Sequence, residues 1–138
     1  MSEAADAARA TVAAYYDAFN AGDAGAMLAL VTDDVEHHVN QGAVRRGRDA
    51  FAEFCSHMGR SYRERLSDIV VFVSDDGTRA AAEFTVHGEY LETDPGLPEA
   101  RGQRYVLPAG TFFTLRAGRI ARVATHYNLQ DWIRQVSA

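Results

Sequence analysis

Residues 67–91 read SDIVVFVSDDGTRAAAEFTVHGEYL, and within them the chain changes to strand periodicity. The apolar run after Ser67 is followed by the turn residues DDG and then by a second run in which apolar and polar residues alternate. A period of two is typical of a strand with one buried face, and a short Asp-Gly turn joins two such strands as a hairpin. This stretch therefore predicts two antiparallel strands.

A second hairpin is expected farther along the chain. The segment ETDPGLPEARG, residues 92–102, is rich in proline and glycine and predicts a loop. Residues 103–116 and 120–128 then have strand patterns joined by the turn AGR, and Pro108 and Gly110 suggest a bulge or bend in the first of them. The chain closes with LQDWIRQV, whose spacing indicates a final amphipathic turn or two of helix.

The residues before this region have helical periodicity. Apolar residues recur at helical spacing from Ala4 to Asn20, and Gly22 is suited to end that helix while Asp23 caps the next one. The predicted elements that follow are a short helix over residues 24–31, a strand over 35–40 and a third helix from Asp49 through Met58. Three helices followed by an antiparallel meander give the α+β class. We expect one domain, residues 1–138, in which a strongly curved antiparallel sheet wraps around the helices.

Composition excludes several classes of protein. The 138 residues are 47% hydrophobic and 24% charged with a net charge of −5, as in an ordinary globular protein, and no basic face suits nucleic acid. We interpret RRGR (45–48) and RSYRER (60–65) as solvated surface. Cys55 is the single cysteine, the N-terminus does not resemble a signal peptide, and no run is long enough to span a membrane. We therefore expect a cytoplasmic protein with no nucleic-acid or membrane partner.

Four segments carry a resemblance to a known family. They are AYYDAFNAGD (14–23), LVTDDV (30–35), HGEYLETDPGLPEARGQ (87–103) and GRIARVATHYNLQDW (118–132). In this order and spacing the chain resembles the NTF2-like superfamily, and within it the ketosteroid isomerase-related and SnoaL-like proteins. The resemblance covers Tyr15 to Trp132 and implies a cone with an apolar pocket for a small ligand.

Ketosteroid isomerases use an aspartate base, with a tyrosine and a protonated aspartic acid as oxyanion donors. The resemblance places the tyrosine at Tyr15, which is retained. It places the base at Val39 and the second donor at Thr111, so the aspartate base is lost and the acid donor is replaced by a hydroxyl. Thr125 stands where some epoxide-opening relatives carry an acid, which argues against that reaction.

Alternation along VEHHV offers a replacement base. Val35, His37 and Val39 share one face of the expected strand, so His37 is predicted to point into the pocket and His38 away from it. Histidine titrates near neutrality and can abstract a proton from a carbon beside a carbonyl. The alternative is a neutral histidine that is hydrogen-bonded in the pocket wall.

Tyr15 would then donate to the oxyanion and Thr111 would assist, although both residue types are also common in packed cores. We expect six further residues to shape the pocket: Phe19, Val39, Phe54, Phe113, Thr125 and Tyr127. The five histidines show no metal-ligand spacing, and no cofactor motif is present. We expect no metal and no cofactor.

Three functions remain open at this point. The first is a cofactor-independent isomerase, or a related proton-transfer enzyme, acting on a small apolar carbonyl compound. The second is a non-catalytic module that binds such a ligand, and the third is an assembly module with a filled core. In each case we expect a homodimer through the outer sheet face, where Phe112, His126 and His87 point outward.

Overall fold

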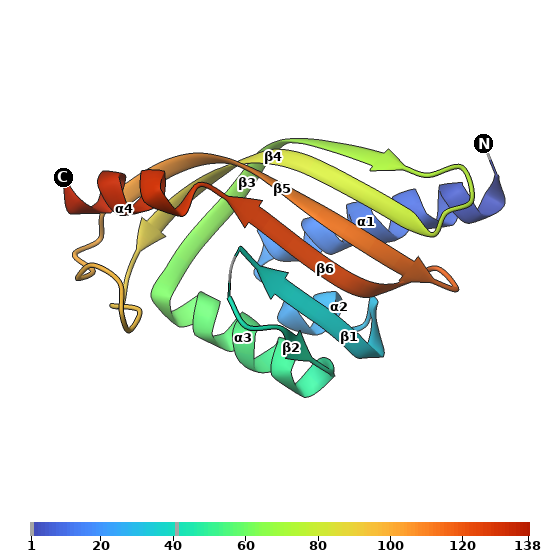
Figure 1. The fold of residues 1–138 in the computed structure, drawn as a ribbon, viewed down its shortest axis with the longest axis horizontal. Helices are drawn as coiled ribbons and strands as arrows, with labels where there is room; N and C mark the ends of the chain where they lie inside the picture. Colours follow the sequence, from blue (N-terminus) through green and yellow to red (C-terminus); the bar gives the residue numbers. More distant parts are fainter. Residues whose placement is uncertain (1, 41) are drawn as a thin grey trace.

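The computed structural model describes residues 2–40 and 42–138. Figure 1 shows a curved sheet with helices α1 to α3 on one side and α4 at the end opposite the N-terminus. The elements, in chain order, are α1 (Glu3–Ala21), α2 (Ala24–Leu28), β1 (Val31–Val39), β2 (Arg45–Arg46), α3 (Arg48–Ser61), β3 (Tyr62–Val73), β4 (Arg79–Tyr90), β5 (Arg104–Arg116), β6 (Arg119–Tyr127) and α4 (Leu129–Ser137).

Helix α1 begins and ends where local capping chemistry predicts. The Ser2 side chain accepts a hydrogen bond from the backbone N–H of Ala5, and this satisfies one free donor of the first turn. Gly22 ends the helix with φ of 69°, a left-handed conformation that glycine adopts without steric cost. Asp23 then caps α2, as expected from the sequence, although α2 ends at Leu28 and is shorter than predicted.

The sheet confirms the α+β class. Its strand order is β2-β1-β6-β5-β4-β3, and strands β3 to β6 form the predicted antiparallel meander. One pair differs from the expected all-antiparallel sheet, because β1 runs parallel to β6. The last strand of the meander would otherwise leave an edge of unpaired backbone groups, and β1 pairs with most of it.

Strand β3 begins at Tyr62, immediately after α3, and not at Ser67 as predicted. A bulge at Asp68, with φ of 54°, interrupts its register with β4. Before the bulge Tyr62 and Leu66 pack on the core, whereas after it the odd-numbered residues do, because an extra residue reverses which face a side chain occupies. The segment RSYRER is therefore partly strand: Arg63 and Arg65 are exposed, but Glu64 borders the interior cavity.

Of the bulge or bend predicted at Pro108 and Gly110, a bulge against β4 is wrong, because the pairing with β4 continues through both residues. The register shift of β5 lies instead against β6, between Thr114 and Leu115.

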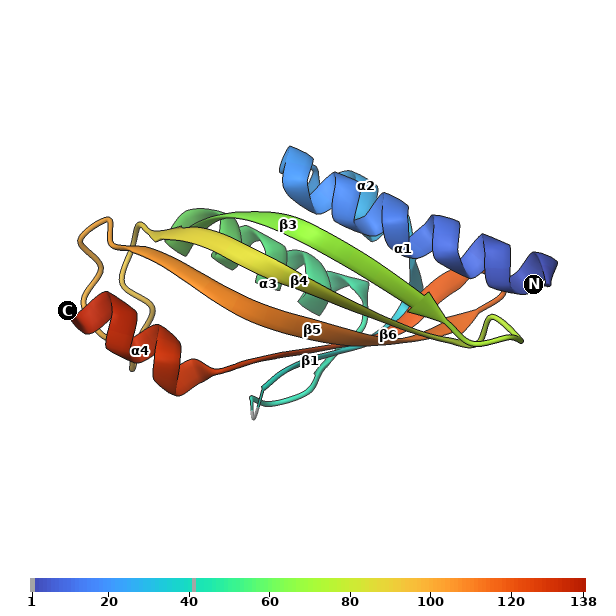
Figure 2. The same ribbon diagram turned by 90° about the horizontal axis from the view of Figure 1, so that it is seen from above.

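The concave side of the sheet and the helices enclose one core. Figure 2 shows α1 and α4 near opposite ends of the sheet. Inward residues of the strands pack with Val12 of α1, Phe51 of α3 and Trp132 of α4. Within residues 2–40 and 42–138, no helix is long and apolar enough to cross a membrane.

Candidate functional site

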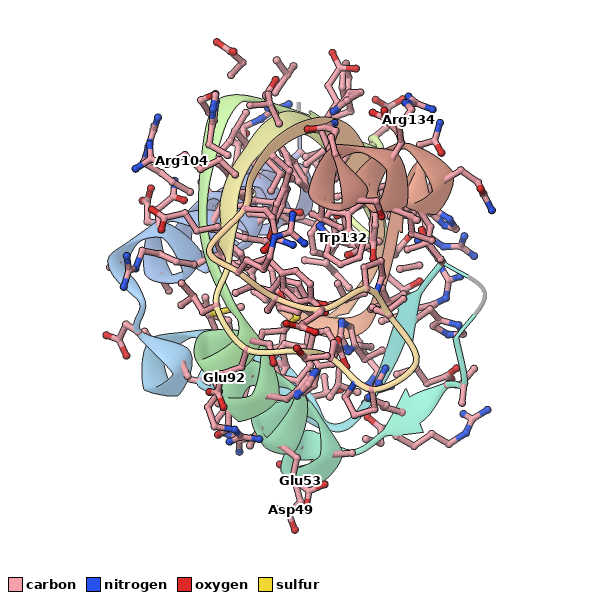
Figure 3. The ribbon with its side chains drawn as sticks, turned by 90° about the vertical axis from the view of Figure 1, so that its left-hand side faces the viewer. Asp49, Glu53, Glu92, Arg104, Trp132 and Arg134 are labelled. Carbon is pink, nitrogen blue, oxygen red and sulfur yellow. The ribbon has the colours of Figure 1, made fainter. Side chains whose placement is uncertain are left out.

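The concave side of the sheet holds a cavity of about 710 Å³. Its walls come from α1, α3, the inward faces of all the long strands, the loop after β4, and the start of α4. Figure 3 looks into the molecule from the end where α4 lies and shows Trp132 near the centre, with the sheet curving around it. A volume of this size suits a small organic molecule.

His37 lies inside this cavity, on the side that strand alternation predicts. Its side chain is 3% exposed, and its ring contacts Phe51 and Phe54 with centroid distances of 5.1 and 4.5 Å. Nδ1 is buried and has no hydrogen-bond partner among the described residues. Burial, together with the charges of Arg45 and His38, lowers the pKa of His37 to about 4, so the ring is neutral at pH 7.

His38 points away from the cavity, as predicted. Its side chain is 26% exposed, and Nε2, which is buried and makes no hydrogen bond among the described residues, lies 3.5 Å from a carboxylate oxygen of Glu36, the residue with which it shares the outer face. The two adjacent histidines therefore occupy different environments and make a matched pair for mutagenesis.

Two tyrosines of α1 and one threonine supply hydroxyl groups to the same region. Tyr15 and Tyr16 contact each other edge to face at 5.3 Å, and both line the cavity. Tyr16 Oη is buried and makes no hydrogen bond of normal geometry in the described part of the chain, although the Thr111 hydroxyl lies near enough to offset part of the rise that burial causes in the Tyr16 pKa. Burial raises the pKa of both phenols, so they remain protonated donors. Thr111 Oγ1 lies 3.3 Å from Thr125 Oγ1, and either hydroxyl can donate.

Five of the six expected pocket residues line the cavity: Phe19, Val39, Phe54, Thr125 and Tyr127. Phe113 does not. It is 1% exposed and packs behind the tyrosines of α1, with its ring 5.8 Å from that of Tyr15 and 6.0 Å from that of Tyr16. The prediction for Phe113 was right about the face of the strand and wrong about contact with the cavity.

Glu64 is a cavity residue that sequence reasoning missed. Its Oε2 accepts a hydrogen bond of 2.5 Å from Tyr105 Oη. Burial raises the pKa of this carboxyl group, and the bond from Tyr105 offsets part of that effect. The signal was present in the sequence, because Tyr62, Glu64 and Leu66 alternate as one face of a strand that starts earlier than Ser67.

Asp94 is a second acid of the cavity, and it lies in the loop that the sequence predicts over residues 92–102. Its Oδ2 accepts a hydrogen bond of 2.7 Å from Tyr62 Oη and lies 3.1 Å from Nε2 of His57. Tyr90 fixes the loop, because its hydroxyl donates to the Pro98 carbonyl at 2.7 Å and accepts from the Asp94 backbone N–H at 2.9 Å. The loop therefore holds a carboxyl group against the cavity.

Arg45 borders the cavity beside His37. The two residues are paired across β1 and β2, and the guanidinium carbon of Arg45 lies 4.7 Å from the centre of the Phe54 ring. No carboxylate within 4.0 Å pairs with Arg45 among the described residues. Its positive charge disfavours a second positive charge on His37 and favours a negative charge on a bound ligand.

Within the part of the chain that the structure describes, no three His, Cys, Asp or Glu side chains are grouped as a metal ion would require. The chemical resources of the cavity are therefore hydroxyl groups, carboxyl groups, a neutral imidazole and one guanidinium. This set can transfer protons and stabilise a developing oxyanion.

Comparison with known proteins gives one family. The sequence model of the SnoaL-like domain matches residues 12–123. No match is found among curated proteins.

Several solved structures are similar over nearly the whole chain. A proposed polyketide cyclase from Silicibacter sp. TM1040 is 60% identical, with a TM-score of 0.93 over 95% of this chain and 96% of that chain. A second, from Pseudomonas putida KT2440, is 60% identical, with a TM-score of 0.90 over 91% of this chain and 95% of that chain. A third, from Xanthomonas campestris pv. campestris, is 55% identical, with a TM-score of 0.93 over 97% of this chain and 99% of that chain.

Proposed function

The chain belongs to the SnoaL-like family, and from that premise we propose that it binds a small, largely apolar carbonyl compound and catalyses a proton transfer on it. Polar atoms without partners inside an apolar cavity are the observation that carries this proposal. His37 Nδ1 and Tyr16 Oη are both buried and unpaired among the described residues. Leaving such atoms without a partner costs about 1–3 kcal/mol each, and a ligand carbonyl or hydroxyl would satisfy them.

The reaction begins with neutral His37 as the base. A ring nitrogen takes a proton from the carbon beside the carbonyl, the electron pair of that C–H bond forms a C=C bond, and the π pair of the carbonyl moves to its oxygen. Tyr15 and Tyr16 donate hydrogen bonds to the resulting enolate, with Thr111 as an auxiliary donor, and the charge of Arg45 favours it. In an isomerisation, another carbon of the ligand takes the proton back from His37 and the carbonyl re-forms. In a ring closure, the enolate carbon attacks a second carbonyl of the same ligand, and the oxygen of that carbonyl takes the proton from His37 as the first carbonyl re-forms.

The low basicity of His37 is compatible with this role. Its pKa of about 4 is close to the value of about 4.6 for the aspartate base of ketosteroid isomerase. His37 lies on the same face of β1 as Val39, the position of the lost aspartate base, and two residues before it. The proposed base is therefore displaced from that position by about 7 Å along the strand.

A β,γ-unsaturated ketone tests the proposal, because its conversion to the conjugated enone is followed by ultraviolet absorbance. We expect His37→Ala to abolish turnover and His38→Ala, the matched control, to retain it. Tyr15→Phe and Tyr16→Phe should each slow the reaction by about 10- to 1,000-fold without unfolding the protein. Equal turnover by His37→Ala and the unmodified chain would remove His37 as the base.

The alternative is a binding module without chemistry, and the loss of the aspartate at Val39 is the observation that favours it. This reading predicts ligand binding that both histidine variants share and no turnover by the unmodified chain. Fluorescence of Trp132, the only tryptophan, reports binding, because its side chain lines the cavity.

We also propose a homodimer through the outer sheet face. Cross-strand pairing aligns five residues in one row there: Phe72, Ala81, Phe112, Ala124 and His38. Phe72 and Phe112 are 52% and 54% exposed, which makes the row an apolar surface suited to a second copy. The ring of His126 meets that of Phe112 edge to face, with 5.7 Å between the ring centres, and extends this surface.

A further inference from the structure

The end of the cavity near α4 contains two carboxyl groups, each with one oxygen engaged. Oε2 of Glu64 is held by Tyr105, and Oδ2 of Asp94 is held by Tyr62 and His57. The other oxygen of each carboxyl group has no hydrogen-bond partner within residues 2–40 and 42–138. Both residues line the cavity, so a ligand in it can reach them.

Few positive charges on the protein balance these acids. The sequence contains no lysine. Arg63 borders the cavity, but its side chain is 72% exposed and its guanidinium lies 3.8 Å from Glu89. Only His57 lies within salt-bridge distance of either acid in the described chain, and it contacts Asp94 and not Glu64. Among the described residues the Glu64 carboxyl group therefore has no counter-ion, and a cation beside it would favour its ionised form against the effect of burial.

Aromatic rings surround the two acids. Tyr62, Tyr127 and Trp132 line the same cavity, and the ring of Trp132 lies 6.1 Å from that of Tyr62. Burial raises the pKa of Tyr127, and the negative charges of Glu64 and Asp94 raise it further, so both acids act on the space beside Tyr127. Aromatic faces carry negative electrostatic potential and attract organic cations.

The position of Glu64 depends on a contact across three strands. Glu64, Gly88 and Tyr105 are aligned in neighbouring strands β3, β4 and β5. A Cβ atom at Gly88 would lie 2.1 Å from Cζ of Tyr105 and 2.4 Å from its Oη. The Tyr105 ring thus crosses over β4 at the one residue that leaves room for it, and it reaches Glu64 on the far side.

We infer that this end of the cavity binds a cationic amino group of the ligand, through the free oxygens of Glu64 and Asp94 and the faces of Tyr62, Tyr127 and Trp132. An ammonium group donates up to three hydrogen bonds and supplies a positive charge, whereas a neutral apolar group would leave the second oxygen of each carboxyl group without a partner. The inference rests on the proposed function and narrows its substrate class to amino-substituted carbonyl compounds.

The positions of the polar side chains also imply that the amino group and the reacting carbonyl lie at different ends of the ligand. His37 lies on β1 and Glu64 on β3, strands separated in the sheet by β6, β5 and β4, which curve around the cavity. A ligand that reached both would have an apolar body between the two polar groups.

Three probes that share one skeleton test the inference: 4-phenylbutylamine, 4-phenylbutanol and 4-phenylbutyrate. Each is titrated at pH 7 while Trp132 fluorescence is recorded. We expect the amine to bind at least tenfold more tightly than the alcohol, and the carboxylate to bind more weakly than both. Glu64→Gln and Asp94→Asn should each reduce the preference for the amine severalfold. Glu83→Gln, which changes an exposed acid on the outer face of β4, should leave it unchanged.

The possible outcomes distinguish the amino subsite from the ligand cavity and from the proposed catalysis. Equal binding of amine and alcohol by the unmodified chain overturns the amino subsite but leaves the ligand cavity standing. Binding of none of the probes overturns the amino subsite, whereas the proposed function stands or falls on turnover of the β,γ-unsaturated ketone. A preference that survives both Glu64→Gln and Asp94→Asn, in variants whose circular dichroism is native, overturns the assignment to these acids. His37→Ala should keep the preference, so a lack of turnover has no bearing on this test.

Discussion

The buried, neutral state of His37 predicts a specific pH dependence of folding. In the folded protein its pKa is lowered to about 4 from the ordinary value of 6.5. The unfolded chain therefore takes up a proton first as the pH falls, and the free energy of unfolding decreases between pH 6.5 and pH 4. At pH 5 this histidine alone should cost about 2 kcal/mol relative to pH 8, and at pH 4 about 3 kcal/mol.

Urea unfolding followed by Trp132 fluorescence measures this effect. His37→Gln cannot take up the proton, so its free energy of unfolding should fall about 2 kcal/mol less than that of the unmodified chain between pH 8 and pH 5. His38→Gln is the control and should retain most of the dependence, because burial, the largest cause of the low pKa of His37, is unchanged in this variant and only the smaller effect of the His38 charge is lost. If His37→Gln and the unmodified chain differ by less than about 0.5 kcal/mol over this range, His37 is not held neutral by burial.

Two further predictions concern packing and assembly. Gly88→Ala should lower the free energy of unfolding by about 3 kcal/mol or more, because the new Cβ displaces Tyr105 and breaks its hydrogen bond to Glu64. In a Tyr105→Ala background, urea unfolding should show a much smaller loss from the same substitution. Equal losses in both backgrounds would contradict the steric explanation. Phe112→Arg should convert the dimer to a monomer, as measured by light scattering at micromolar concentration. Val44 is an exposed apolar residue outside the row, so Val44→Arg should leave the dimer intact. A monomeric unmodified chain would refute the assembly.

Much of the fold follows from local patterns. Gly22 and Asp23 mark a helix end and a helix start because their conformational and capping preferences act within one turn. The inward position of His37 was predictable because Val35 and Val39 require one face of β1 to be buried. These inferences depend only on residues close together in the sequence, so the sequence alone is sufficient for them.

The incorrect or missing predictions concern features that depend on contacts between segments far apart in the sequence. Glu64 was missed because α3 passes directly into β3 without a turn, and the exposed Arg63 and Arg65 made the start of the strand appear to be surface. The parallel pairing of β1 with β6 is set by which edge of the sheet is free, and no local pattern encodes it. Phe113 lies on the inward face of β5 as predicted, but Tyr15 and Tyr16 of α1 stand between it and the cavity. The sequence pattern of β5 alone contains no information about those tyrosines.

Proton exchange at carbon tests the central claim most directly. In deuterated buffer, 2-tetralone loses its α-protons, and nuclear magnetic resonance follows that loss without requiring a complete isomerisation. If His37 takes a carbon-bound proton inside the cavity, the unmodified chain and His38→Ala should accelerate the exchange to the same extent, and His37→Ala should reduce it to the buffer rate. Exchange that is equally fast with His37→Ala, or no acceleration by the unmodified chain despite binding detected through Trp132, would contradict the account.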